Sequence, residues 1–165
     1  MEGEVSTSWV LDIGFCRCIP ILLEVEGMYV NNPKDPGGET NWGISKRSYP
    51  NLDIKAITAQ EAAQIYYNDF WCKAGCVNMQ YPLAGYVFID AVNMGVVEAV
   101  KLLQQQVGVS TDGVVGPQTL QAANALPVFQ HYKYLQMLLN HYRTLPGWAT
   151  FGHGWENRLL RQACL

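Results

Sequence analysis

Two carboxylates end the first apolar segment of the chain, and one of them is placed for acid chemistry. Glu24 and Glu26 would lie about 200° apart around a helix, because successive helical residues turn by about 100°. Glu26 continues the apolar stripe of segment 15–26, whereas Glu24 falls on the opposite face. A carboxyl beside apolar side chains loses hydration, which raises its pKa and keeps it protonated near neutral pH, as a general acid requires. The position also allows a Glu at a helix end that simply reaches solvent.

The loop that follows supplies a second carboxylate and a hydroxyl. Asp35 comes nine residues after Glu26, and Thr40 comes five after Asp35, within segment 31–43, which contains two Pro and three Gly. This composition predicts a rigid and sharply turned loop. The loop could place Asp35 opposite Glu26 across a bound sugar, and two carboxylates that flank a glycosidic bond are the usual apparatus of glycoside hydrolysis. A turn-initiating Asp before Pro36 and a backbone-capping hydroxyl are the structural alternatives.

Helical periodicity predicts the elements that must position these groups. The expected helices span 15–26, 58–71, 82–95, 96–107, 117–125, 128–145 and 155–164. Gly27 is the stop signal of the first, and a capping box at 58–61 opens the second. The almost wholly apolar 82–95 is expected to be the buried central helix, in which Asp90 serves as a structural hydrogen-bonding group. Because no run alternates convincingly, we predict a mainly α single domain, with room for a small β-hairpin within 40–46.

Composition excludes several classes of protein. The chain has 165 residues with 49% hydrophobic content, enough for one compact core. No apolar run reaches the roughly 18 residues that a spanning helix needs. The 11 Lys and Arg against 14 Asp and Glu exclude a uniformly basic nucleic-acid binder. We therefore expect no nucleic-acid partner and no stable membrane insertion. Residues 1–98 carry a net charge of −6 and residues 99–165 carry +3, which fits ordinary surface variation or a face that tolerates an anionic polymer.

No spacing typical of a metal or nucleophile site occurs. The five cysteines are odd in number and form no CxxC pair, and the three histidines have no Cys or Ser partner at a recognisable distance. We therefore expect no metal and no organic cofactor. Residues 1–14 begin with an acidic segment where a secretory signal is basic, and we expect them to be a leader outside the core.

Long segments of the chain resemble glycoside hydrolase family 108, the lysozyme-like N-acetylmuramidases, which include phage endolysins and proteins labelled secretion activators. The likeness covers roughly 15–165. It is carried by EGMYVNNPKDPGGETNWGISKRSYPNLDIK, ITAQEAAQIYYNDFW, AVNMG at 91–95 and FGHGWENRLLR near the end. Residues 96–126 are similar to the peptidoglycan-binding region fused to that family's domain. The resemblance implies a lysozyme-like catalytic region at 15–95 and a helical peptidoglycan-binding-like region at 96–165, packed as one domain.

The resemblance also implies catalytic roles. Residues 26–29 (EGMY) occupy the place of the family's EGGY motif, whose Glu is essential, with Met28 where the motif has its second Gly. The order Glu26, Asp35, Thr40 is similar to the Glu/Asp/Thr triad of phage-type lysozymes, with the Asp–Thr gap one residue shorter. On this likeness Glu26 protonates the leaving glycosidic oxygen. Asp35 stabilises developing positive charge or orients an attacking water, and Thr40 helps to hold that water.

Substrate contacts are expected from residues in the family-like motifs. Tyr29, Asn41, Trp42 and Asn93 are the candidates, because aromatic faces and amide groups suit sugar rings. A core aromatic that holds the loop is the alternative for Trp42. Glu39 is a further carboxylate, ranked below Asp35.

The expected function is therefore hydrolysis of the β-1,4 bond between N-acetylmuramic acid and N-acetylglucosamine in the glycan strand of peptidoglycan. Two alternatives stay open: a non-hydrolytic peptidoglycan-binding or secretion-accessory protein, and a lytic transglycosylase. The protein is expected to be made in the cytoplasm and to act at the cell wall after release or export by a separate route. The sequence indicates neither the stereochemistry of the reaction nor the oligomeric state.

Overall fold

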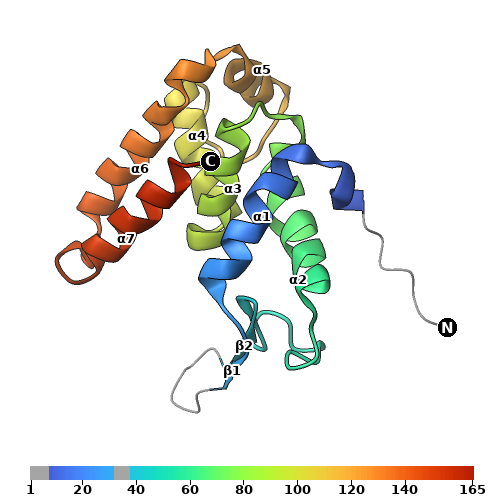
Figure 1. Cartoon of the computed structure of the whole chain (residues 1–165). Helices are drawn as coiled ribbons and strands as arrows, with labels where there is room; N and C mark the ends of the chain where they lie inside the picture. The colour runs from blue at the N-terminus through green and yellow to red at the C-terminus, as the bar shows by residue number, and fades with distance from the viewer. Residues whose placement is uncertain (1–7, 32–37) are drawn as a thin grey trace. The chain divides into compact units, whose positions relative to one another are not determined.

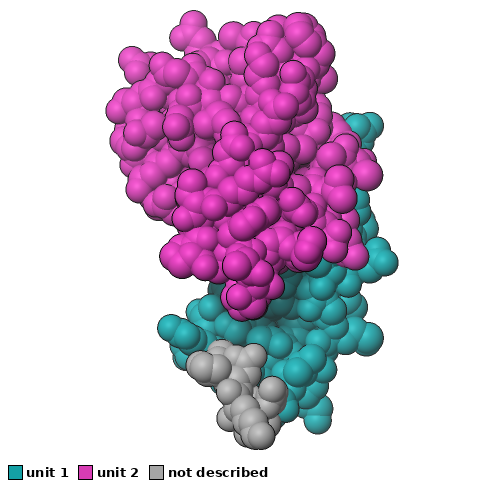
Figure 2. Space-filling model, turned by 90° about the vertical axis from the view of Figure 1, so that its left-hand side faces the viewer, with its two compact units in different colours: residues 1–68 teal, residues 69–165 magenta. Residues whose placement is uncertain are grey.

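A computed structural model describes residues 8–31 and 38–165 and shows a mainly α protein with a small antiparallel sheet (Figure 1). The predicted mainly α class is confirmed. The chain forms two compact units, the N-terminal unit (residues 1–68) and the C-terminal unit (residues 69–165), which Figure 2 colours separately. The division falls after residue 68, and the predicted catalytic and peptidoglycan-binding-like regions stay predictions.

The first long helix begins earlier than its apolar stripe indicates. A short 3-10 helix, η1 (Ser8–Leu11), leads into α1 (Ile13–Glu26). The Asp12 side chain caps α1 by accepting a hydrogen bond from the backbone N–H of Phe15 at 3.0 Å. The Trp9 ring meets Phe15 edge-to-face, with 5.8 Å between ring centroids. The last part of the predicted leader therefore caps and packs against the helix.

One face of α1 is apolar and buried, as predicted. Phe15, Cys18, Ile19 and Leu22 are its buried residues, and their spacing of three and four positions is that of a single helix face. Burial of each large side chain contributes about 1.5–3 kcal/mol. The helix ends at Gly27, which has a φ of +77° and whose N–H bonds to the last turn, so the predicted stop signal is confirmed.

The N-terminal unit also contains a three-stranded antiparallel sheet. Its strands β1 (Val30–Asn31), β2 (Glu39–Asn41) and β3 (Ile44–Ser45) lie in the order β1-β2-β3. The hairpin of β2 and β3 confirms the predicted one within 40–46. Its two turn residues, Trp42 and Gly43, both have positive φ, as type I′ hairpin turns require. The pairing of β1 with β2 was not expected from the sequence.

The second long helix has the predicted beginning but a different end. The capping box at Thr58 and Glu61 is fully formed and opens α2 (Ala59–Tyr66). The chain then continues as a π-helix, η2 (Tyr67–Cys72), where an α-helix was predicted to reach Trp71. Residues five apart lie on nearly one face of a π-helix, which lets both Tyr66 and Trp71 be buried. Apolar periodicity does not reveal this change of winding.

The C-terminal unit is built around α3 (Leu83–Met94) (Figure 1). Every residue from 83 to 91 is buried, which confirms the predicted central helix. Its other helices are η3 (Cys76–Asn78), α4 (Val96–Val107), α5 (Pro117–Ala125), η4 (Val128–Gln130), α6 (Tyr132–Thr144) and α7 (Trp148–Gln162). Helices α4, α6 and α7 pack against α3, and α5 packs against α4.

Helix α7 begins seven residues before the predicted start at 155. Glycines at 152 and 154 lower the helix propensity of this segment, but aromatic packing overrides it. Trp148 and Phe151 both pack against Trp155, with ring centroids 6.2 Å apart in each pair. Gly152 is buried, and a Cβ there would lie 3.0–3.2 Å from the Trp148 ring.

Asp90 is fully buried in α3 and joins that helix to α7. Its Oδ1 accepts a hydrogen bond of 2.8 Å from the Gln162 side-chain amide. Burial raises the pKa of Asp90 to about 7, against the smaller lowering effects of Gln162, Tyr134 and Arg158. These contacts fit the predicted structural role. Among the residues that the structure describes, no helix combines the length and apolar character that crossing a bilayer requires.

The raised pKa of Asp90 makes stability depend on pH in a defined direction. Between about pH 4 and pH 7 the native protein holds a proton that the unfolded chain has released, so the free energy of unfolding falls as pH rises, by up to about 1.4 kcal/mol per pH unit. Asp90→Asn removes this contribution. Urea unfolding at pH 5 and pH 7.5 should show a smaller pH effect in the variant, and an equal effect in both proteins would refute this account of Asp90.

Candidate active site

Glu26 lies where the sequence places it, on the buried side of α1. It is the last residue of the helix and follows Leu22 by four positions on the same face. Its side chain is half-buried, whereas that of Glu24 is exposed. The predicted contrast between the two carboxylates is confirmed, and Glu26 is the one removed in part from water.

The Glu26 side chain rests directly on the β2–β3 turn. A Cβ built on Gly43 would lie 2.9 Å from both Cγ and Oε2 of Glu26, and closer still to the hydroxyl of Tyr66. Real Cβ atoms do not come this near to other heavy atoms, so residue 43 has to be glycine for these groups to approach. Its φ of +77° also favours glycine. The turn, the end of α1 and α2 therefore converge on this one backbone position.

Trp42, the other turn residue, is held in an unusual backbone conformation. Its φ is +52°, in the left-handed region that costs a non-glycine residue about 1–2 kcal/mol. The Trp42 carbonyl accepts a 3.0 Å hydrogen bond from the Tyr66 hydroxyl. Strained residues of this kind persist where surrounding contacts impose them and concentrate at functional sites.

Tyr66 ends α2 and is buried beside Glu26. Burial raises its pKa, and the negative charges of Glu26 and, to a smaller extent, Tyr49 raise it further. The side chain is therefore a neutral phenol at every pH at which the protein would work. Its hydroxyl donates to a backbone carbonyl and presents no charge to the Glu26 carboxyl.

Asn41 ties the hairpin to the segment that precedes α2. Its side chain is buried, and its amide nitrogen lies 3.0 Å from the carbonyl oxygen of Ile54, 3.2 Å from that of Ile57 and 3.4 Å from that of Lys55. These carbonyls occupy the amide's donors. The predicted contact of Asn41 with substrate stays a prediction, and the structure shows a positioning function for the same side chain.

Tyr29 and Glu39 form a polar pair beside the sheet. The Tyr29 hydroxyl donates to Glu39 Oε2 at 3.0 Å, and this bond is the main reason that the pKa of Tyr29 is raised. Lys55 Nζ lies 6.0 Å from the centroid of the Tyr29 ring. Thr40, half-buried in β2, alternates with Glu39 and Asn41 and so points to the other face of the strand.

The structure brings Glu26 to the Trp42–Gly43 turn, with Thr40 and Asn41 on β2 and Tyr29 just before β1. Asp35 lies outside the described residues. Asn93 belongs to the C-terminal unit, near the end of α3, where its amide nitrogen is buried without a hydrogen-bond partner among the described residues. No group of three or more His, Cys, Asp or Glu side chains in the described ranges is arranged to hold a metal ion.

Sequence reasoning missed two residues of this site. Gly43 has one local signal, a glycine in a turn between two short strands, but nothing in the sequence shows that a carboxylate rests on it. No feature of the sequence marks Tyr66 as part of the site, because it is indistinguishable from the other aromatic residues expected in the core. Its contact with Trp42 joins residues 24 positions apart.

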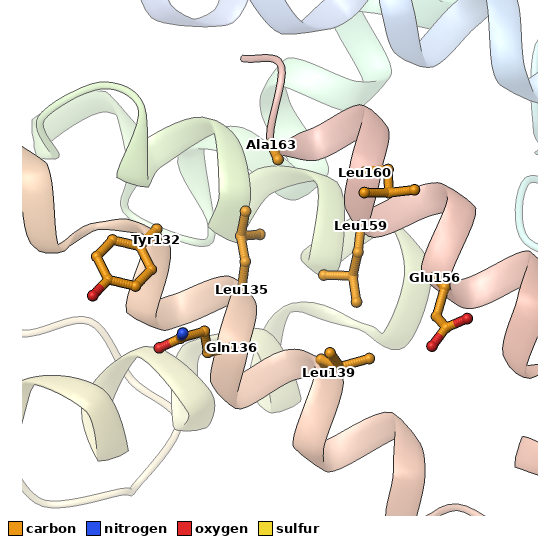
Figure 3. A pocket seen from close by; sticks show the side chains of 8 residues that line it. All are labelled: Tyr132, Leu135, Gln136, Leu139, Glu156, Leu159, Leu160 and Ala163. Carbon is orange, nitrogen blue, oxygen red and sulfur yellow. The ribbon is translucent and has the colours of Figure 1, made fainter.

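A groove elsewhere lacks the chemistry of the Glu26 site. A cavity of about 400 Å³ runs between α6 and α7, where leucines face one another (Figure 3). Its lining residues are Tyr132, Leu135, Gln136, Leu139, Glu156, Leu159, Leu160 and Ala163. Glu156 is the one carboxylate in this lining, and it lies 3.8 Å from the exposed His153 ring. The groove therefore offers no pair of carboxylates.

Comparisons with known proteins show which family the chain belongs to. The family model described as glycosyl hydrolase 108 matches residues 19–95, from within α1 to the residue after α3. The solved structure of Brucella abortus SagA is similar to this chain with a TM-score of 0.78 and 32% identity, over 90% of each chain. No curated protein matches the chain. The chain belongs to glycosyl hydrolase family 108, a family of glycoside hydrolases.

Asn41→Ala should destabilise the protein because three backbone carbonyls lose their donor. We expect the free energy of unfolding to fall by about 1–3 kcal/mol, measured by urea unfolding. Asn51→Ala, at an exposed position of the same unit, is the matched control and should have little effect. Equal stability of the two variants would show that the Asn41 bonds do not hold the hairpin.

Proposed function

We propose that this protein hydrolyses the glycan strand of peptidoglycan at the β-1,4 bond between N-acetylmuramic acid and N-acetylglucosamine, with Glu26 as the general acid. The observation that carries the proposal is the placement of Glu26 in a family 108 chain: it is half-buried and rests on Gly43 beside the neutral Tyr66. Partial removal from water favours the protonated form of a carboxyl.

The protonated Glu26 donates to the glycosidic oxygen. The bond from the anomeric carbon to that oxygen breaks, the leaving sugar departs as an alcohol, and positive charge develops on the ring that remains. A water molecule then adds to the anomeric carbon and gives up a proton, which restores the protonated form of Glu26, so that one water is consumed for each bond cut. We propose that Asp35 stabilises the positive charge or orients this water and that Thr40 helps to hold it.

Sugar contacts are proposed for the side chains of Tyr29, Asn41, Trp42 and Asn93, of which Asn41 already bonds through its amide nitrogen to backbone carbonyls. Trp42 is half-buried in the same turn as Gly43, on which the Glu26 side chain rests. The Tyr29 hydroxyl is already bonded to Glu39, which leaves the ring as its contact surface. Aromatic faces with a few fixed polar groups are typical of small-ligand sites.

The region 96–126 is proposed to contact the wall as well. A single buried side chain, Gln104, organises its loop. The Gln104 amide nitrogen donates to Asp112 Oδ1 at 2.7 Å and to the Val114 carbonyl at 2.9 Å, and the Gly113 N–H donates to its oxygen at 2.8 Å. The hydrogen bonds that Asp112 accepts hold the pKa of its carboxyl below its usual value. The loop is thus rigid and borders a cavity of about 400 Å³.

We propose that the protein reaches the bacterial cell wall after release or export by a separate route, where peptidoglycan is its substrate. No cofactor is needed for this reaction, because a carboxyl and water supply its chemistry.

Glu26→Gln tests the proposal, because it keeps the size of the side chain and removes its proton. We expect release of reducing ends from purified peptidoglycan to fall by about 10²–10⁴-fold with the fold intact by circular dichroism. Glu24→Gln makes the same change two residues earlier on the exposed face and should keep the wild-type rate. A Glu26→Gln variant as active as Glu24→Gln would exclude Glu26 as the acid.

A further inference from the structure

We propose that Tyr66 is a positioning residue: its hydroxyl fixes the Trp42–Gly43 turn, and this turn is the support that sets the place of the Glu26 carboxyl. The inference rests on the proposed function, because it assigns a role in presenting the general acid. It follows from three contacts within the N-terminal unit, which involve side chains and backbone from α1, the hairpin and α2.

The first contact fixes the turn. Two residues connect β2 to β3, because Asn41 pairs with Ile44 across the hairpin. Both connecting residues have positive φ, and the one that is not glycine, Trp42, requires outside support to remain there. The Tyr66 hydroxyl supplies that support through its 3.0 Å bond to the Trp42 carbonyl. Asn41 provides a second anchor on the strand side through the carbonyls of Ile54 and Ile57.

The second contact, between Gly43 and the Glu26 side chain, makes the position of the carboxyl depend on the position of the turn. The Glu26 side chain lies so close to Gly43 that no side chain fits between them. A displacement of the turn therefore moves the surface on which the carboxyl rests, while the backbone of α1 stays where its buried stripe holds it. A shift of about 1 Å in a reacting group can reduce a rate by about 100-fold.

The third contact, between the Tyr66 side chain and the region of the Glu26 carboxyl, explains why the group that supports the turn is a phenol. Tyr66 is almost completely buried (2% exposed) next to a carboxyl, where a charged donor such as lysine would form an ion pair and hold Glu26 in its ionised form. A phenol donates its one proton to the Trp42 carbonyl and remains neutral. It can therefore anchor the turn without drawing the proton from the acid.

Tyr66→Phe and Tyr134→Phe together test the proposal. Tyr134 is also fully buried and also donates to a backbone carbonyl, that of Ala99 at 3.3 Å, but it lies in the C-terminal unit and outside the catalytic machinery. Both variants lose one buried hydroxyl, and we expect Tm to fall in both, although Tyr134→Phe also removes the hydrogen bond between Tyr134 and Asp90. On purified peptidoglycan, Tyr66→Phe should lower kcat at least about tenfold with KM within about twofold, whereas Tyr134→Phe should change neither.

Gly43→Ala and Gly108→Ala form a second matched pair. Both glycines have similar positive φ, +77° and +72°, so alanine strains both backbones, but nothing lies within 4 Å of a Cβ at Gly108. Only Gly43→Ala should displace Glu26. A ¹³C label on glutamate carboxyls reports this without activity, and the resonance that Glu26→Gln removes belongs to Glu26. That resonance should move in Tyr66→Phe and Gly43→Ala and stay in Tyr134→Phe and Gly108→Ala.

The outcomes separate the two proposals. A Glu26 resonance that is unmoved in Tyr66→Phe, or an equal loss of kcat in Tyr66→Phe and Tyr134→Phe, overturns the positioning role. If Glu26→Gln releases reducing ends as fast as the wild type, the acid assignment fails. The resonance shifts still decide in that case whether Tyr66 and Gly43 position the carboxyl.

Discussion

The absence of a side chain at residue 43 is the constraint on which the candidate site depends. The end of α1, the β2–β3 turn and the last residue of α2 meet there at distances that any Cβ would forbid. Each element reaches this point for a local reason: Gly27 ends the helix, a two-residue turn reverses the hairpin, and a capping box starts α2. Their convergence places an acid, a strained turn and a neutral phenol in contact.

Burial acts in opposite ways in the two units. In the N-terminal unit, Glu26 is only partly buried beside Tyr66, and the proposed acid role depends on that position. In the C-terminal unit, Asp90 and Gln104 are completely buried but serve the fold, since Asp90 bonds to Gln162 and Gln104 to the loop after α4. Burial can therefore raise the pKa of a carboxyl without making it part of an active site. The surrounding elements decide the role of the group.

Local signals in the sequence predict much of the fold. The apolar stripe of α1, its stop at Gly27 and the capping box at Thr58 depend on residues a few positions apart, and all three are confirmed. The same stripe separates Glu26 from Glu24. Features that depend on distant contacts are not predictable in this way. Helix propensity alone also fails to predict the early start of α7, where the packing of Trp148 and Phe151 against Trp155 outweighs the effect of glycine.

The same distinction between local signals and distant contacts applies to the residues of the candidate site. Residue type and spacing select Glu26 and a small hairpin within 40–46, because acid chemistry and sharp turns have local signatures. They do not select Tyr66, whose hydroxyl bonds to a carbonyl 24 residues earlier. They also do not show that the Asn41 amide donates to the backbone carbonyls of Ile54 and Ile57. Asp35 stays a prediction from spacing and family resemblance, since it lies outside the described residues.

The products of wall digestion test the central claim most directly. Mass analysis of the fragments that the wild-type protein releases from purified peptidoglycan shows whether water has been added across the glycosidic bond. The account predicts fragments that carry one added water and a new reducing end on N-acetylmuramic acid. Fragments that end in an anhydro sugar would indicate transglycosylation, and an intact glycan retained on the protein would indicate binding alone. Either result would contradict hydrolysis with Glu26 as the acid and water as the acceptor.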